Sequence, residues 1–222
     1  MTVNLKTIIA LLIGTCAMMI PIMVLMKRYQ VKTLKGIPVA FVLTITGTMG
    51  TYIWHFVESS WFGPRSFYGA VFLVPLAFIY VAKLIRIPYG DLMDFCAPAE
   101  CAMLVIMKYQ CLVDGCCAGR VLFFAADGAV VFPSQIAETV NAAVIMVILV
   151  CMAFSLKNRG KIYPWYLILY GVSRFVLNWF RADIDPLLMG LPAGNLWSVL
   201  AVFIGVLWVR GYKLAIVKTA KV

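Results

Sequence analysis

Long apolar runs, separated by short polar segments, dominate the pattern of this 222-residue chain. A helix that crosses a bilayer needs about 20 consecutive apolar residues. Seven segments reach or approach that length, and we expect each to be a spanning helix: Thr7–Met26, Ile37–Val57, Phe67–Ala82, Leu92–Val113, Ile136–Leu156, Ile162–Phe180 and Leu196–Val209. Because the linkers are brief, residues 1–222 are predicted to form one all-α domain, a polytopic membrane protein.

The composition changes this picture little. Hydrophobic residues make up 64% of the chain and charged residues 13%, whereas a soluble domain has about 45–50% and roughly 25%. The net charge of +10 is typical of a membrane protein whose cytoplasmic loops are basic. We therefore expect membrane lipid as the surroundings of this chain, and no nucleic-acid partner.

The basic residues are spread unevenly over the predicted loops. Most of the 19 Lys and Arg residues fall on one side: Lys27, Arg28, Lys32, Lys35, Lys83, Arg86, Lys157, Arg159, Lys161, Arg210, Lys213, Lys218 and Lys221. Because basic loops are retained in the cytoplasm, we expect the N-terminus outside and the C-terminus in the cytoplasm. The loops between spans 2–3, 4–5 and 6–7 then lie outside. Chemistry there would use preactivated lipid, water or redox partners, so we expect no nucleotide cofactor.

The stretch from Lys108 to Glu138 holds the most unusual chemistry of the chain, beginning KYQCLVDGCCAGR. Its cysteines, Cys111, Cys116 and Cys117, show no repeated C-x2-C zinc spacing, so we expect no metal. Cys111 could form a disulfide with Cys116 or Cys117 in an oxidising exterior. Alternatively, the three side chains fill a tight glycine-rich turn as small residues.

Four charged residues inside predicted spans stand out: Glu100, Lys108, Glu138 and Arg174. A charge at the bilayer centre costs roughly 2.5–3.5 kcal/mol on insertion scales, so such residues face the bundle interior and suggest function. The alternative is structural pairing, for example of Glu138 with Arg174 or of Glu100 with Lys108.

The sixth predicted span has polar residues on one face. Tyr170, Arg174, Asn178 and Arg181 recur every three to four residues, the spacing of neighbours on a helix surface. Guanidinium groups bind phosphate through two parallel hydrogen bonds. This face is therefore suited to the phosphodiester of a lipid headgroup.

Two polar features near the predicted outer surface allow two interpretations each. Pro133 fits a helix start with Ser134 and Gln135 in its first turn, either as an ordinary start or as an anion site. His55, the only histidine, lies in the aromatic sequence YIWHFVE. It either anchors the helix at the interface or serves as a base near pH 7.

Five stretches carry a pattern of motifs. Phe67–Ala70 matches [H/Y]-G-G, and Met107–Arg120 aligns without gaps to a signature that begins G-R-x-G-N-F and ends in G-R, in the cysteine-bearing form C-x-x-x-G-C-C-x-G-R. Phe132–Glu138 matches H-P-S-Q-L-Y-E, and Tyr170–Arg181 matches Y-G-x-x-R-F-x-x-E-x-x-R. Leu191–Asn195 resembles the turn that opens the last helix. With these motifs in this order, the chain resembles the bacterial prolipoprotein diacylglyceryl transferases.

The resemblance implies a function. That family moves the diacylglyceryl group of phosphatidylglycerol to the lipobox cysteine of a secreted prolipoprotein, at the outer face of the bacterial inner membrane and without a metal or soluble cofactor. We expect a phosphatidylglycerol or other anionic phospholipid site whose catalytic residues are Arg174, Lys108, Tyr68 and His55. The residues expected to bind substrate are Arg120, Gly119, Ser134, Gln135, Glu138, Tyr170, Asn178 and Arg181.

The chain departs from the family pattern at several positions that bear on the site. Lys108 stands in place of an arginine, Cys111 in place of an asparagine, and Asn178 in place of a glutamate. Tyr68 and Phe132 each occupy a position where the motif has histidine. Two further hypotheses therefore remain open: a non-catalytic or altered-acceptor lipid-binding relative with the same fold, and a membrane thiol–disulfide protein.

Overall fold

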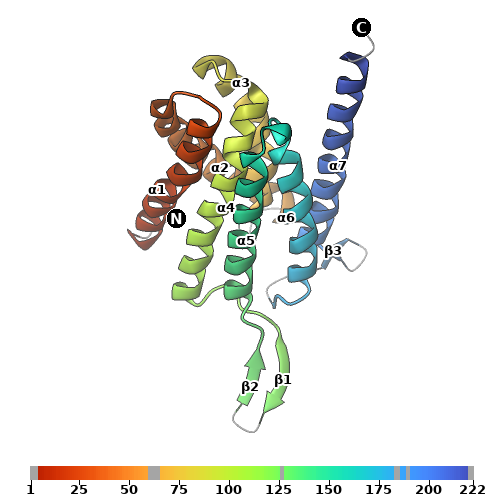
Figure 1. The fold of residues 1–222 in the computed structure, drawn as a ribbon. Helices are drawn as coiled ribbons and strands as arrows, with labels where there is room; N and C mark the ends of the chain where they lie inside the picture. Colours follow the sequence, from red (N-terminus) through yellow and green to blue (C-terminus); the bar gives the residue numbers. More distant parts are fainter. Residues whose placement is uncertain (1–4, 60–65, 126–127, 183–185, 189–190, 220–222) are drawn as a thin grey trace.

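The structure, a computed structural model, describes residues 5–59, 66–125, 128–182, 186–188 and 191–219. Its α-helices lie side by side in an elongated bundle (Figure 1). They are α1 (Leu5–Arg28), α2 (Gly36–Ser59), α3 (Tyr68–Ile85), α4 (Tyr89–Asp114), α5 (Ser134–Phe154), α6 (Ile162–Asn178) and α7 (Ala193–Thr219). The short 3-10 helices η1 (Thr33–Lys35) and η2 (Leu156–Asn158) lie in two of the connections.

Each predicted span corresponds to one of these helices; the ends differ by a few residues, except that α7 continues ten residues beyond the predicted end at Val209. Within the described residues, six helices are long and apolar enough to cross a membrane, and α6, with 17 residues, is the exception. The prediction of a helical, multi-pass membrane protein is therefore confirmed. The count of seven spans and the orientation of the termini remain predictions.

The centre of the bundle is α4, which packs against α1, α3, α5 and α6. The first half of α4 is buried almost completely, with Leu92 and Phe95 fully shielded from solvent. Small side chains such as Cys96 and Ala99 are also fully buried there. They allow neighbouring helices to approach α4 closely, as in other membrane bundles.

A close backbone approach joins α2 to α3. A Cβ atom added to Gly69 would overlap the carbonyl oxygen of Gly50. A larger residue at either position would force the helices apart. This contact fixes the start of α3, where Tyr68 lies, against the C-terminal half of α2.

At the opposite end of the bundle, two acidic residues of α4 fasten the connection between α5 and α6. Asp94 accepts hydrogen bonds from the Tyr29 hydroxyl at 2.9 Å and the Ile162 backbone N–H at 2.8 Å. Asp91 accepts two hydrogen bonds from the Arg159 guanidinium, at 2.7 and 2.6 Å. Burial and, after it, the Asp94 carboxylate raise the pKa of the Tyr29 hydroxyl well above its usual value, so this hydroxyl stays protonated and keeps donating.

The structure also contains strands that the all-α prediction lacks. The antiparallel strands β1 (Val121–Ala125) and β2 (Gly128–Val131) form a hairpin between α4 and α5. The hairpin projects beyond the ends of the helices (Figure 1), and its apolar side chains are exposed, including Phe124 at 82%. A second small pair, β3 (Pro186–Leu188) and β4 (Leu191–Pro192), precedes α7.

Candidate active site

One carboxylate, Glu138, binds cations from three parts of the chain. Its Oε2 atom lies 2.5 Å from Lys108 Nζ of α4 and 2.5 Å from Arg174 Nη1 of α6. Its other oxygen, Oε1, accepts a hydrogen bond from Arg181 Nη1 at 2.8 Å. Glu138 is in the second turn of α5 and is only 4% exposed. The described residues therefore bring together four of the charged residues singled out in the sequence.

This cluster has more positive than negative charge. Lys108 and Arg174 share a single carboxylate oxygen, and both side chains are mostly buried, at 12% and 16% exposure. Without counting Arg181, two cations face one anion. Buried charges are stable only when they are paired. The arrangement therefore favours binding of a further anion beside Lys108 and Arg174.

The observed ion pairs partly follow the predicted ones. Glu138 forms an ion pair with Arg174, as the structural-pairing alternative predicted. Glu100 does not pair with Lys108 in the structure; instead, its carboxylate accepts a hydrogen bond from the Tyr163 hydroxyl at 3.2 Å. The reason is helix geometry, because Glu100 and Lys108 are separated along α4 by more than two turns.

Arg181 lies beyond the helix to which it was assigned. Helix α6 ends at Asn178, so Arg181 does not extend the Arg174 face as a helical residue. It forms an isolated antiparallel bridge with Gly119 and is buried. Its guanidinium nevertheless reaches Glu138, as described above.

Gly119 and Arg120 connect the cysteine-bearing loop to the end of α6. Arg120 donates two hydrogen bonds to the segment after α6. Its backbone N–H donates to Phe180 O at 2.8 Å, and its Nε donates to Arg181 O at 2.9 Å. A Cβ atom at Gly119 would overlap the carbonyl oxygen of Phe132. The glycine is therefore required for the close passage of two backbone segments.

Ser134 and Gln135 hold the same loop from the first turn of α5. The Ser134 hydroxyl donates to Cys117 O at 2.5 Å, and the Gln135 amide donates to Cys116 O at 2.6 Å. Helix α5 begins at Ser134, directly after Pro133, as predicted. In this structure, both side chains position the cysteine loop, and their predicted contact with substrate stays a prediction.

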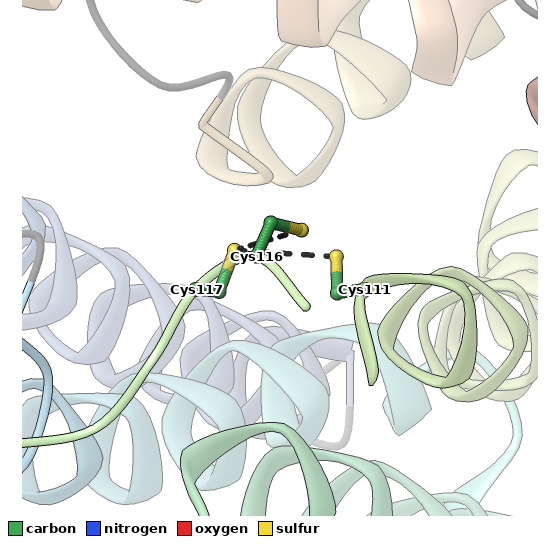
Figure 2. A group of neighbouring side chains, drawn as sticks. All are labelled: Cys111, Cys116 and Cys117. Carbon is green, nitrogen blue, oxygen red and sulfur yellow. Dashed lines mark hydrogen bonds between the residues drawn. The ribbon is translucent and has the colours of Figure 1, made fainter. Parts of the chain in front are cut away.

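The three loop cysteines converge on one another (Figure 2). Cys117 Sγ lies 3.8 Å from Cys116 Sγ and 4.0 Å from Cys111 Sγ. All seven cysteines of the chain are thiols in the structure, and a disulfide would need a sulfur–sulfur distance of about 2.05 Å. Cys116 is exposed; partial desolvation and, after it, the neighbouring Cys117 raise the pKa of its thiol.

Two buried tyrosines lie next to the cation cluster. Tyr68 and Tyr170 are both buried, with their ring centroids 5.6 Å apart. Ser198 Oγ lies 2.6 Å from the Tyr68 hydroxyl and donates to Gly194 O at 2.6 Å. Because a serine hydroxyl has one proton, Tyr68 is the donor in its contact with Ser198. Tyr170 precedes Arg174 by one helical turn, so this pair forms a wall beside the guanidinium.

An apolar cavity of about 420 Å³ lies mainly between α3, α6 and α7. Trp54, Phe72, Leu76 and Trp208 are among its lining residues. One of these lining residues, Phe72, stacks on Tyr68 with the ring centroids 5.7 Å apart.

Two buried amides lie where α6 ends and α7 begins. Asn178 and Asn195 are each 1% exposed, and the amide atoms of both lack a hydrogen-bond partner among the described residues. A Cβ atom at Gly194 would meet the Asn178 amide nitrogen at 2.6 Å. Unpaired buried amides are uncommon and often mark a functional position.

Sequence reasoning missed several residues of this region. Ser198, Asn195 and Trp197 lie in the first turns of α7, and Trp54 and Trp197 make an edge contact at 4.9 Å. The turn motif before α7 was the available signal, but it did not indicate which side chains face the site. His55 belongs to α2, and its side chain lies outside the described part of the chain.

Comparison with known proteins agrees with the resemblance. The sequence profile described as prolipoprotein diacylglyceryl transferase matches residues 8–210. A phosphatidylglycerol–prolipoprotein diacylglyceryl transferase of Geobacter sulfurreducens is 32% identical over 142 residues, which are 60% of this chain and 54% of that protein.

More distant relatives carry the same name. The Polaromonas naphthalenivorans protein is 26% identical over 177 residues, covering 72% of this chain and 65% of the relative. The Acinetobacter baumannii protein is 29% identical over 177 residues, covering 72% and 64%. This chain thus spans less than two thirds of the length of the relatives it matches. The profile covers most of the chain, and the chain belongs to the prolipoprotein diacylglyceryl transferase family.

Proposed function

We propose that this protein transfers the diacylglyceryl group of phosphatidylglycerol, or of another anionic phospholipid, to the cysteine thiol of a lipobox-bearing prolipoprotein. The observation that carries the proposal is the cluster in which Lys108 and Arg174 share one oxygen of Glu138. An anionic phosphodiester would supply the negative charge that the cluster lacks. The names of the relatives support the choice of lipid and acceptor.

The phosphate would bind Lys108 and Arg174 while both keep their contact with Glu138. A lysine ammonium has three donors and a guanidinium has five, and the ion pairs with Glu138 are made by Lys108 Nζ and Arg174 Nη1. The remaining donors can reach phosphate oxygens. Glu138 would then hold the Lys108 and Arg174 side chains in the orientation that binds phosphate.

The apolar cavity supports the lipid half of the proposal. It lies mainly between α3, α6 and α7, and its lining residue Phe72 stacks on Tyr68. Acyl chains in this cavity would place the glyceryl carbons near Tyr68 and Tyr170. The headgroup phosphate would then lie beside Arg174, which follows Tyr170 by one helical turn.

The reaction would proceed by displacement at carbon. The acceptor thiolate attacks the glyceryl carbon that is bonded to the phosphate oxygen, a C–S bond forms, and the C–O bond breaks. The electron pair leaves with glycerol phosphate. Negative charge grows on the leaving phosphate in the transition state, and Lys108 and Arg174 would stabilise it there. The site residues Arg120, Gly119, Ser134 and Gln135 would shape the loop that faces the acceptor.

We further propose seven spans in one domain of an inner-membrane protein, with the N-terminus outside. The clustering of basic residues at one end of the helices supports this orientation. Reporter fusions truncated at Arg120 should be active only with a reporter that works outside the cytoplasm, and fusions truncated at Arg159 only with a cytoplasmic reporter. The opposite pattern would overturn the orientation and the exterior chemistry with it.

The function is tested in a cell by complementation. We expect this chain to support growth of a bacterial strain depleted of its own transferase and to restore modified lipoproteins on gels. The departures at Cys111, Phe132 and Asn178 favour the alternative, a lipid-binding relative that is non-catalytic or uses another acceptor. Stable membrane expression without any modified lipoprotein would support that alternative.

A further inference from the structure

The sulfur atoms of Cys111, Cys116 and Cys117 form a compact triangle (Figure 2). Two of its sides are 3.8 and 4.0 Å, and all three sulfurs lie within 4.8 Å of one another. The nearest point that is equidistant from the three sulfurs is therefore at most about 2.5 Å from each of them, close to the Zn–S bond length of about 2.3 Å. The separation is thus suited to one metal ion between three thiolates.

The local backbone is built to hold this triangle. Gly115 ends α4 in a left-handed conformation, and Cys117 adopts φ +60°, a conformation that non-glycine residues rarely adopt. The Ser134 and Gln135 hydrogen bonds described above fasten the carbonyls of Cys117 and Cys116. Such a backbone outlier in an anchored loop is a recognised sign of a functional constraint, and small packing residues would not require it.

The charge next to the triangle is complementary. Three thiolates around a divalent zinc ion carry a net charge of −1. Lys108 precedes Cys111 by three residues on α4, so both lie on one face of the helix, about 4.5 Å apart along its axis. The Lys108 ammonium would balance this charge, and it also belongs to the proposed phosphate site.

We propose that Cys111, Cys116 and Cys117 bind a zinc ion and leave its fourth position for the acceptor thiol. This goes against the expectation from cysteine spacing, which indicated no metal site. The choice of zinc follows from the ligands, because thiolates select soft or borderline ions and zinc with three protein ligands keeps an open position. The second half of the inference rests on the proposed function.

The ion would activate the acceptor. A thiol that coordinates zinc is deprotonated, with its proton released to solvent. The zinc-bound sulfur then attacks the glyceryl carbon, the C–O bond to phosphate breaks, and glycerol phosphate leaves. The thioether product is a weaker ligand than a thiolate and dissociates. Zinc is neither oxidised nor reduced, and the three cysteines remain bound throughout.

Metal binding is tested without any activity. The purified full-length protein, treated with chelator and loaded with Zn²⁺ or Co²⁺, should bind one ion per chain with a thiolate-to-cobalt absorption band. Cys111→Ser, Cys116→Ser and Cys117→Ser should each weaken binding at least tenfold, whereas Cys151→Ser, an exposed cysteine of α5, should not. Unchanged binding in the three variants, or a quantitative disulfide in place of the thiols, would overturn the site. Tighter binding of Cu⁺ than of Zn²⁺ would overturn the choice of zinc.

The open position is tested with a lipobox peptide. The visible bands of the cobalt-loaded protein should change when the peptide is added and should not change with a peptide whose cysteine is serine. Bands unaffected by either peptide would contradict the role of the ion in thiol activation.

Transfer measurements separate this inference from the proposed function. Full transfer by chelator-treated protein would contradict the zinc inference and would leave the proposed function unaffected. A metal-loaded protein that binds the peptide thiol but transfers no diacylglyceryl group from phosphatidylglycerol would support the thiol site and contradict the proposed function.

Discussion

Arg174→Gln is expected to reduce diacylglyceryl transfer by about 10²–10³-fold, the range seen when one donor to a developing negative charge is removed. Arg174 Nη1 is held 2.5 Å from Glu138 Oε2, with the guanidinium largely buried next to Tyr170. The loss should fall on the rate of transfer, because the developing charge on the leaving phosphate is stabilised less. Release of glycerol phosphate from labelled phosphatidylglycerol, in the presence of a lipobox peptide, measures it.

Two variants separate chemistry from folding in this prediction. Arg174→Lys keeps the charge but loses the two-pronged geometry, so its activity should lie between those of the wild type and Arg174→Gln. Arg28→Ala removes an arginine at the opposite end of the bundle, where Arg28 donates to Phe154 O at 3.0 Å, and should transfer normally. Wild-type rates in a folded Arg174→Gln protein would leave Arg174 with a structural role only.

The second large effect is on stability. Glu138→Gln leaves Lys108, Arg174 and Arg181 without their shared carboxylate, and breaking a buried ion pair costs about 3–5 kcal/mol. We therefore expect a clearly lower unfolding temperature in detergent, measured by fluorescence-detected gel filtration after heating. Anionic phospholipid should restore part of this loss, because its phosphate replaces the missing negative charge.

Glu100→Gln is the matched control for this substitution. Glu100 is as deeply buried as Glu138, at 3% exposure, but its carboxylate contacts the Tyr163 hydroxyl and, among the described residues, no cation. A glutamine can still accept that hydrogen bond, so the change should be small. The double variant Glu138→Gln with Lys108→Met removes one uncompensated cation and should recover stability. Equal unfolding temperatures for Glu138→Gln and Glu100→Gln would contradict the charge argument.

The helices were predictable because hydropathy alone determines them in a bilayer. The start of α5 at Ser134 was also predictable, since Pro133 is favoured at such a position. The hairpin was missed although its signal is present: Asp127-Gly128 lies between apolar, β-branched and aromatic residues. In a chain dominated by spanning helices, such a short apolar stretch is hard to distinguish from a loop.

The polar site was only partly predictable. The sequence identified Lys108, Glu138 and Arg174 as costly buried charges, but their meeting depends on how α4, α5 and α6 pack. The cysteine triangle is harder still, because it requires the left-handed backbone of Cys117 and the hydrogen bond from Ser134. Neither is visible in residue spacing.

The proposed transfer is tested most directly by mass spectrometry of a lipobox peptide incubated with the purified protein and phosphatidylglycerol. We expect the peptide mass to increase by one diacylglyceryl group attached at its cysteine, with one glycerol phosphate released per modified peptide. A peptide with serine in place of that cysteine should stay unmodified. A folded protein that binds phosphatidylglycerol and the peptide, yet gives no modified peptide, would contradict the account.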